Sequence, residues 1–230
     1  MVASKIIKHN KKHNLTFDKE NHKYFVDGVE YQSVTVFLKK YFPFDRHKIA
    51  SALAQKNLTT KKEIFKQWDL VRDNGSHVHD LIDRYLKNER LTKPQLNKIV
   101  NVLKFIEENK LEILASEVQV FSKKYKLAGT IDLLAKNPKG QILIIDWKTN
   151  RKPILKKDVF DMAKHPLSEF PNNKFYQYSM QLSLYSLILK QEYKIDVFDT
   201  FLVQLSKDSY QVIDTLNLEY DMLEVLNSIN

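Results

Sequence analysis

The chain of 230 residues contains no cysteine. This absence excludes disulfide bonds, a zinc site with thiolate ligands and an iron–sulfur cluster. Any bound metal must therefore be held by oxygen atoms or by histidine nitrogens. The sequence has only four glycines and six prolines, and it contains no internal repeat, low-complexity tract or Ser/Gly linker. Together with the length, these features indicate a single folded core.

The sequence also lacks a long apolar run. No segment approaches the length of a membrane span, and the opening "MVASKIIKHNKKHN" is too polar for a secretory signal. We therefore expect no membrane association and a cytoplasmic location, in a bacterium or a phage-infected host. A mitochondrial or nuclear location is the alternative, because the opening is rich in lysine and has no acid.

Positive charge exceeds negative charge by nine, with 37 lysines and arginines against 28 acids, and the isoelectric point is about 9.4. This excess favours an anionic partner such as nucleic acid, although lysine-rich surfaces are often only solvated faces. Hydrophobic residues make up 43% of the chain. That fraction is ample for a buried core.

The first third of the sequence predicts a β-hairpin followed by helix. Residues 15–37 alternate apolar and polar positions around Asp27-Gly28, a dipeptide typical of tight hairpin turns. The lysine-rich residues 35–74 then carry an apolar stripe at helical spacing, which we expect to end near Gly75. This stripe consists of Ile64, Phe65, Trp68 and Val71.

The rest of the sequence mixes helices and strands. We expect one helix to enter at Gly75-Ser76 and another at Pro94. From residue 116 the apolar period becomes two, which predicts three successive strands and then an irregular loop over residues 151–176. A helix over 177–191, two strands around Lys207 and a closing helix follow. This order describes a mixed α/β, or α+β, fold.

Charged residues stand at the end of the most apolar predicted strand, "ILIIDWK". Asp146 and Lys148 are two apart and so leave one face of the strand together. Asp132 lies on the preceding strand, and Glu117 lies on the strand before that. Gly129 is close by, where a backbone or ligand can approach. Half-exposed strand faces and salt bridges also place acids and lysines in this way, so each pair alone is ambiguous.

Clustered carboxylates repel one another unless a cation neutralises them. Mg²⁺ or Mn²⁺ accepts carboxylate and main-chain oxygens, and we expect the carbonyl of Trp147 to contribute. A metal there lowers the pKa of bound water and stabilises charge on a phosphodiester. Lys148 is expected to orient the nucleophile or neutralise developing negative charge.

These residues stand in a series of short motifs. "GSHVH" at 75–79 comes first, then Glu117, "GTID" ending at Asp132, "IDWKT" at 145–149 and "QLSLY" at 181–185. In this order they resemble the PD-(D/E)xK nuclease superfamily, specifically its RecB-like exonuclease branch. That branch includes mitochondrial genome maintenance exonucleases, CRISPR-associated nucleases and phage exonucleases. The residue before Asp132 is isoleucine instead of the proline in the superfamily's name.

The resemblance implies roles for individual residues. His79, Asp132, Asp146 and the Trp147 carbonyl would bind the metal, and Lys148 would be the catalytic lysine. Asp132, Asp146 and Glu117 are also assigned to the catalytic group, Glu117 with the less certain role. The substrate-binding or site-supporting residues would be Gln181, Tyr185, Tyr178 and Ser76. A helix-capping histidine and a packed tyrosine are the ordinary alternatives for His79 and Tyr185.

For the fold, the resemblance implies a restriction-endonuclease-like core over residues 75–230, with a central mixed sheet flanked by helices. Residues 1–74 would form a hairpin and helical extension packed on that core. For function it implies a Mg²⁺- or Mn²⁺-dependent DNA exonuclease, without an iron–sulfur cluster, in replication, repair or recombination. A structure-specific endonuclease and a non-catalytic nucleic-acid-binding module are the alternatives.

The expected partner is single-stranded DNA or a DNA end. Because no helicase motor is present, a helicase or single-strand-binding protein is a candidate partner. Lysines and arginines would hold phosphates, and residues 35–74 and 151–176 would wall the substrate path. Aromatic residues are expected to stack on bases, with core packing as the alternative for Trp147. They are Trp68, Trp147, Tyr176 and Tyr178.

Overall fold

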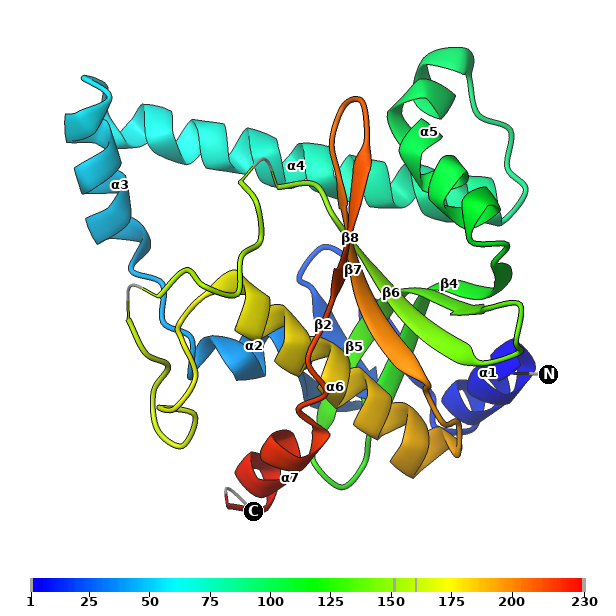
Figure 1. Ribbon diagram of the computed structural model, residues 1–230. Helices are drawn as coiled ribbons and strands as arrows, with labels where there is room; N and C mark the ends of the chain where they lie inside the picture. The colour runs from blue at the N-terminus through cyan, green and yellow to red at the C-terminus, as the bar shows by residue number, and fades with distance from the viewer. Residues whose placement is uncertain (1, 151, 160, 229–230) are drawn as a thin grey trace.

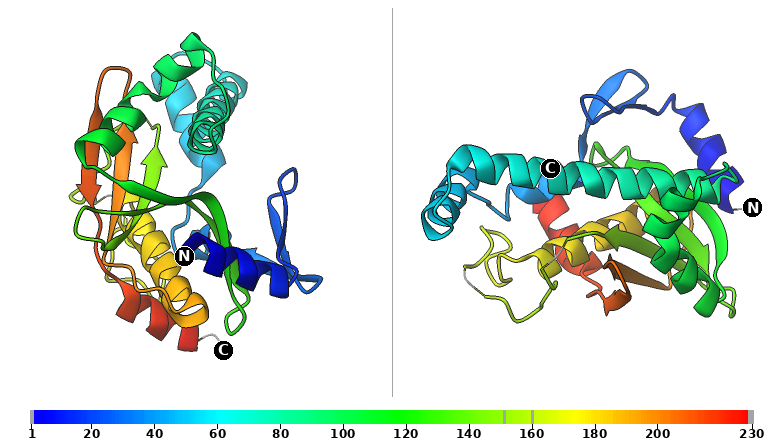
Figure 2. Two further views of the ribbon diagram at one scale, coloured as in Figure 1. Left: turned by 90° about the vertical axis from the view of Figure 1, so that its right-hand side faces the viewer. Right: turned by 90° about the horizontal axis from the view of Figure 1, so that it is seen from above.

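A computed structural model describes residues 2–150, 152–159 and 161–228. Within these residues an eight-stranded sheet runs in the order β1-β2-β3-β5-β6-β7-β8, with β4 paired to β5. Helices cover both faces of the sheet (Figures 1 and 2). The strands are β1 (Thr16–Asp18), β2 (Lys23–Val26), β3 (Val29–Ser33), β4 (Glu112–Ser122), β5 (Leu127–Lys136), β6 (Ile142–Lys148), β7 (Asp199–Leu205) and β8 (Tyr210–Asp214). The helices are α1 (Val2–Lys12), α2 (Val34–Lys39), α3 (Arg46–Lys56), α4 (Lys61–Leu86), α5 (Lys93–Glu108), α6 (Lys174–Tyr193) and α7 (Glu219–Ser228).

The expected mixed α/β class is confirmed. Strands β4, β5 and β6 form the predicted antiparallel meander, because short turns join them. Strand β7 lies parallel to β6, and β3 lies parallel to β5. A parallel pair requires a crossover connection, which helix α6 provides between β6 and β7. The sheet is therefore mixed, with helices as its crossovers.

The N-terminal hairpin is confirmed at its turn, where Asp27 and Gly28 have φ angles of 49° and 79°. Its second strand ends earlier than the alternation suggests. The side chain of Ser33 accepts a hydrogen bond from the backbone N–H of Val36 at 3.2 Å and so caps helix α2. Helix α1, which precedes the hairpin, was not predicted.

The largest difference from the prediction concerns Gly75. The expected helix boundary at Gly75-Ser76 is wrong, because α4 continues without interruption from Lys61 to Leu86. A glycine inside a helix costs only about 1 kcal/mol relative to alanine, and packing explains its presence here. A Cβ at position 75 would lie 2.8 Å from Oγ1 of Thr149. The missing side chain lets α4 approach the end of β6.

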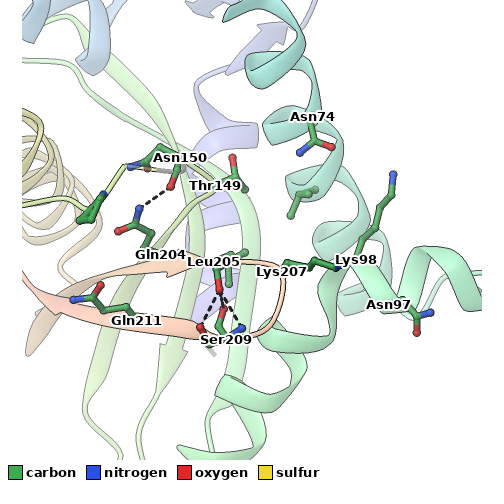
Figure 3. Close-up of a pocket in the computed structure, with 13 residues that line it drawn as sticks. Asn74, Asn97, Lys98, Thr149, Asn150, Gln204, Leu205, Lys207, Ser209 and Gln211 are labelled. Carbon is green, nitrogen blue, oxygen red and sulfur yellow. Dashed lines mark hydrogen bonds between the residues drawn. The ribbon is translucent and has the colours of Figure 1, made fainter. Parts of the chain in front are cut away.

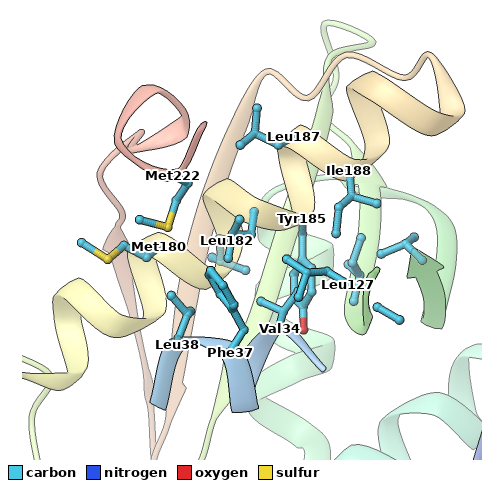
Figure 4. Packing of buried hydrophobic residues seen from close by; sticks show 14 of the residues in the cluster. Val34, Phe37, Leu38, Leu127, Met180, Leu182, Tyr185, Leu187, Ile188 and Met222 are labelled. Atoms are coloured by element: carbon cyan, nitrogen blue, oxygen red, sulfur yellow. The ribbon is translucent and has the colours of Figure 1, made fainter. Parts of the chain in front are cut away.

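The core has one layer on each face of the sheet. Helices α2, α6 and α7 pack on one face, with Phe37, Leu182 and Met222 among the buried residues (Figure 4). Helices α4 and α5 pack on the other face, in a cluster that contains Trp147. Trp147 is 1% exposed and packs edge-on against Phe105. The prediction that Trp147 stacks on bases is therefore wrong, and the alternative prediction, that it packs in the core, is confirmed.

The segment between β6 and α6 is irregular, as predicted. Within residues 152–159 and 161–173, its regular pairing is limited to an isolated bridge between Met162 and Pro171. Residues 151 and 160 of the predicted loop lie outside the described residues. Helix α6 begins at Lys174, three residues before the apolar pattern suggests, because Asn173 caps it by accepting the N–H of Tyr176.

No helix in the described part of the chain combines the length and apolar character that crossing a membrane requires.

Candidate active site

The candidate site lies where β5 and β6 separate. These strands pair as far as Leu133 and Ile145. The next residue on each strand is an aspartate, so continuation of the register places Asp132 opposite Asp146. The backbone N–H of Trp147 donates a hydrogen bond to Oδ2 of Asp132 at 2.8 Å, which closes this end of the pairing. We call the position of these two aspartates the fork.

Strand β4 brings a third carboxylate to the fork. Its pairing with β5 places Ser116 beside Leu133 and Val118 beside Ile131, so Glu117 lies opposite Asp132. The φ angle of Glu117 is 45°, in the left-handed region that few residues other than glycine adopt. Such conformations gather at functional sites, where the surrounding structure holds them in place. This strained position within a strand gave no signal in the sequence.

Helix α4 supplies His79 to this group. Its Nδ1 lies 3.4 Å from Oε1 of Glu117 and 3.5 Å from Oδ2 of Asp132. Its Nε2 donates a hydrogen bond to the carbonyl oxygen of Trp147 at 3.1 Å. One ligand atom each from His79, Glu117 and Asp132 lie within 4.8 Å of one another. Three elements thus converge on one small volume.

The electrostatics of this group favour a cation. Burial disfavours a charged His79, yet Asp132 and Glu117 raise the pKa of the imidazole well above its ordinary value. Burial raises the pKa of Glu117, whereas His79 lowers the pKa of Asp132 in spite of burial. The imidazolium therefore balances the two carboxylates. When the ring of His79 loses the proton on Nδ1, this nitrogen and the carboxylate oxygens form a donor set that Mg²⁺ or Mn²⁺ accepts, so the residues fit a divalent metal.

Asp146 and Lys148 form an ion pair beside this group, with side chains 5% and 15% exposed. Burial raises the pKa of Asp146 to about 6. Although burial opposes its charge, Asp146 raises the pKa of Lys148 above the usual lysine value. The ammonium of Lys148 also lies 4.0 Å from the ring centre of Tyr178. Metal binding by Asp146 and by the Trp147 carbonyl remains a prediction.

Helix α6 supports the fork from the other face of the sheet. Nε2 of Gln181 lies 3.4 Å from Oδ1 of Asp146 and 3.4 Å from the hydroxyl of Tyr185. Gln181 and Tyr185 are buried, at 8% and 3% exposure. A Cβ at Gly129 would lie 2.5 Å from Cε1 of Tyr185. The close approach expected at Gly129 is therefore made by this tyrosine ring.

The other predicted residues lie farther from the metal-ligand group. Ser76 is exposed on α4, and Tyr176 and Tyr178 are half-buried on α6. Trp68 packs with the rings of Phe44 and Phe65 at centroid distances of 5.8 Å. Substrate contacts by these side chains stay predictions.

Lys174 is a residue that the sequence reasoning missed. Its ammonium lies 5.7 Å from the ring centre of Tyr178, the same ring that Lys148 contacts. Desolvation and the positive charges of Lys148 and Lys39 lower its pKa. Lys39, Lys148 and Lys174 come from three separate elements, α2, β6 and α6. The only signal in the sequence was the position of Lys174, one helical turn before Tyr178.

Three comparisons with known proteins bear on the site. The family model described as the PD-(D/E)XK nuclease superfamily matches residues 46–216. No curated protein matches the chain. The crystal structure of SSO0001 is similar, with a TM-score of 0.38 and 15% identity, covering 99% of this chain and 85% of that one. At that score the structural likeness carries no argument, whereas the family match includes α4, the fork and α6.

Proposed function

The chain belongs to the PD-(D/E)XK nuclease superfamily, and from this premise we propose a DNA exonuclease of the RecB-like branch that depends on Mg²⁺ or Mn²⁺. It would hydrolyse phosphodiester bonds in single-stranded or frayed DNA ends during replication, repair or recombination. The convergence of His79, Glu117 and Asp132 beside the Asp146–Lys148 pair carries the proposal. A module that only binds nucleic acid would not need clustered carboxylates where phosphates must approach, because carboxylates and phosphates repel each other.

Each residue of the site has a distinct task in this proposal. His79, Glu117 and Asp132 would hold the divalent ion, with Asp146 and the Trp147 carbonyl next to them. When bound, the ion supplies Lewis-acid stabilisation of negative charge on the phosphate. Because its pKa is raised, Lys148 is protonated at neutral pH and acts as a cation toward a phosphate oxygen.

The buried residues around the fork are assigned supporting roles. Gln181 and Tyr185 would fix the orientation of Asp146, since their burial favours support over contact with a DNA backbone. Tyr178 would hold the Lys148 ammonium over its ring. Rigid support of this kind keeps the reacting groups in one geometry.

The substrate path follows from charge and from the helical segments. Residues 46–74, comprising α3 and the first half of α4, extend away from the sheet (Figure 1). Together with residues 152–159 and 161–176 they would wall a path for one strand, with residues 1–74 packed on the nuclease core. Lys174 and Lys39 would contact phosphates near the site, and Trp68 and Tyr176 would stack on bases. A helicase or single-strand-binding protein would supply the unpaired strand.

The test compares wild type with Lys148→Ala on end-labelled single-stranded, duplex and circular DNA, in Mg²⁺, Mn²⁺ or EDTA. Wild type should degrade linear DNA only with metal, and the label should report the polarity. Lys148→Ala should lose cleavage but keep its fold and most of its DNA affinity, although its melting temperature should fall because Asp146 loses its partner in a buried ion pair. Cutting of circles would establish the alternative endonuclease. Binding without cleavage in any metal would reject catalysis.

A further inference from the structure

A cavity of about 710 Å³ lies beside the fork, on the side where β6 ends (Figure 3). It is bounded by α4, α5, the segment after β6 and the β7–β8 hairpin. Thr149 and Asn150, which line it, directly follow Lys148, and Val78 directly precedes His79. The cavity is therefore lined by direct chain neighbours of Lys148 and His79.

The lining of this cavity differs in chemistry from the fork. Five amide side chains, three hydroxyl groups and the lysines Lys98 and Lys207 surround it, and none of its described lining residues is acidic or aromatic. We call this cavity the amide pocket. Amides and hydroxyls can donate to and accept from sugars and base edges, and lysines bind phosphate. Without aromatic side chains, the pocket cannot hold bases by stacking.

The walls of the amide pocket are fixed by hydrogen bonds. Nε2 of Gln204 donates to the carbonyl oxygens of Asn150 at 2.6 Å and Lys152 at 2.8 Å, which holds the segment after β6. Nδ2 of Asn101 on α5 donates to the carbonyl oxygen of Ser206 at 3.0 Å, which anchors the tip of the hairpin. The cavity is thus preformed, as small-molecule sites usually are.

Several polar side chains at the pocket are available for a ligand. Asn74, Asn97, Lys98, Lys207 and Gln211 line it, and their side chains make no hydrogen bond or ion pair with the described part of the chain. They come from α4, α5 and the hairpin, so they surround the mouth. A volume of about 710 Å³ falls in the range of about 300–1,000 Å³ typical of small-ligand sites.

We propose that the amide pocket receives the one or two nucleotides on one side of the scissile phosphate and holds the released mono- or dinucleotide by its phosphate. This assignment rests on the proposed nuclease function. Lys98 and Lys207 would contact the phosphate, and Asn74, Asn97 and Gln211 would contact sugar and base. The carboxylates of the fork repel the phosphate of a product, whereas the amide pocket attracts it. The pocket would thus set the length of the product.

The test measures binding of deoxynucleoside 5′- and 3′-monophosphates and of a 5′-phosphorylated dinucleotide in EDTA by calorimetry, so no cleavage takes place. The Lys98→Ala/Lys207→Ala variant should bind about tenfold or more weakly, as expected for loss of hydrogen bonds to a charged group. Lys139→Ala/Lys190→Ala removes the same charge from exposed positions outside the pocket and should bind like wild type.

Three outcomes would overturn the assignment: no binding by wild type, unchanged binding by the pocket variant, or equal loss in the control variant. A second measurement uses Gln211→Trp, which places a large side chain at the opening of the amide pocket. This variant should change the length of the products that remain when DNA digestion is complete. Unchanged product lengths would also count against the pocket. If wild type binds dinucleotide but cleaves no DNA with any metal, nucleotide binding by the pocket stands, whereas the proposed nuclease function and the role of the pocket in product length fail.

Discussion

The fork and the helical arm, residues 46–74, are built in opposite ways. At the fork, charged side chains are partly or fully buried and contact the two main layers of the core. The arm has a separate small cluster of Ala50, Ala54 and Ile64, with Trp68 partly buried beside it. Most of its lysines are exposed. The difference shows that the charged groups of the fork are held by the main core, whereas the arm, which we propose to contact the substrate, has little packing of its own.

Removal of one carboxylate from the fork should have the largest effect. Asp132→Asn keeps an oxygen for the N–H of Trp147 but removes the charge that faces His79. Cleavage should fall by about 10²–10³-fold, as for other losses of one preorganised electrostatic group. The measurement is hydrolysis of end-labelled DNA, and the matched control is Asp214→Asn, at an exposed position on β8. Near-normal activity of Asp132→Asn would show that the carboxylate of Asp132 is not needed for catalysis.

A methyl group at Gly129 should disturb the fork through its support. In Gly129→Ala the new Cβ meets the ring of Tyr185 at 2.5 Å, so the ring must move away from Gln181. Overpacking of this kind costs about 1–3 kcal/mol, measurable by urea unfolding. In the Gly129→Ala/Tyr185→Leu background, stability should recover while activity stays low. Recovery of both would show that Tyr185 has no part in positioning Asp146.

Charge removal on the arm should change DNA affinity without touching the chemistry. Lys62 and Lys66 lie on the exposed face of α4, around a shallow pocket with Phe65. The logarithm of the DNA-binding constant falls as the logarithm of the salt concentration rises. If both lysines contact phosphates, Lys62→Ala/Lys66→Ala should make this slope less steep by about 0.7 per contact for single strands. Hydrolysis of a small phosphodiester such as bis-p-nitrophenyl phosphate should be unchanged. An unaltered salt slope would exclude the arm from the substrate path.

The smallest effect concerns helix α1, which belongs to neither region. Burial, followed by the charge of His13, lowers the pKa of His9 below its ordinary value. The unfolded chain therefore binds more protons near pH 6, and stability falls as pH decreases through the ordinary histidine range. His9→Gln should lessen this fall, because it removes the group whose pKa differs between the folded and the unfolded chain. The ionic groups near His9 are His13, Glu192, Lys12 and Lys123.

Thermal melts at pH 5 and pH 8 can check this prediction, with His22→Asn, an exposed histidine, as the control. An equal pH dependence in wild type and His9→Gln would mean that His9 is protonated as readily in the folded protein as in the unfolded chain.

The sequence predicted the fork well because its signals are local and periodic. The apolar run before Asp146 predicted that strand, and the period of two placed Asp132 on the strand that precedes it. The interruption of α4 was predicted wrongly because intrinsic propensity favours a break at Gly75, whereas contact with Thr149 decides it. Such a contact joins residues far apart in the chain. No periodicity reveals it.

Other parts depended on tertiary structure in the same way. The left-handed backbone of Glu117, within the paired part of β4, leaves no mark in composition. Lys174 lies near Lys148 only because α6 begins above the end of β6. The amide pocket is assembled from α4, α5 and a hairpin distant in sequence. The positions of residues carried by motifs were therefore predictable, and a cavity assembled from scattered polar residues was not.

The most direct test of the central claim is Mn²⁺ binding at the fork, measured by calorimetry on wild type, Glu117→Gln and Glu112→Gln. Glu112 is an exposed acid at the start of the same strand, 3.4 Å from Lys136. Wild type and Glu112→Gln should bind Mn²⁺ equally, and Glu117→Gln should bind at least about tenfold more weakly. Equal affinity in all three proteins, or no binding by wild type, would contradict the assignment of His79, Glu117 and Asp132 as the metal site.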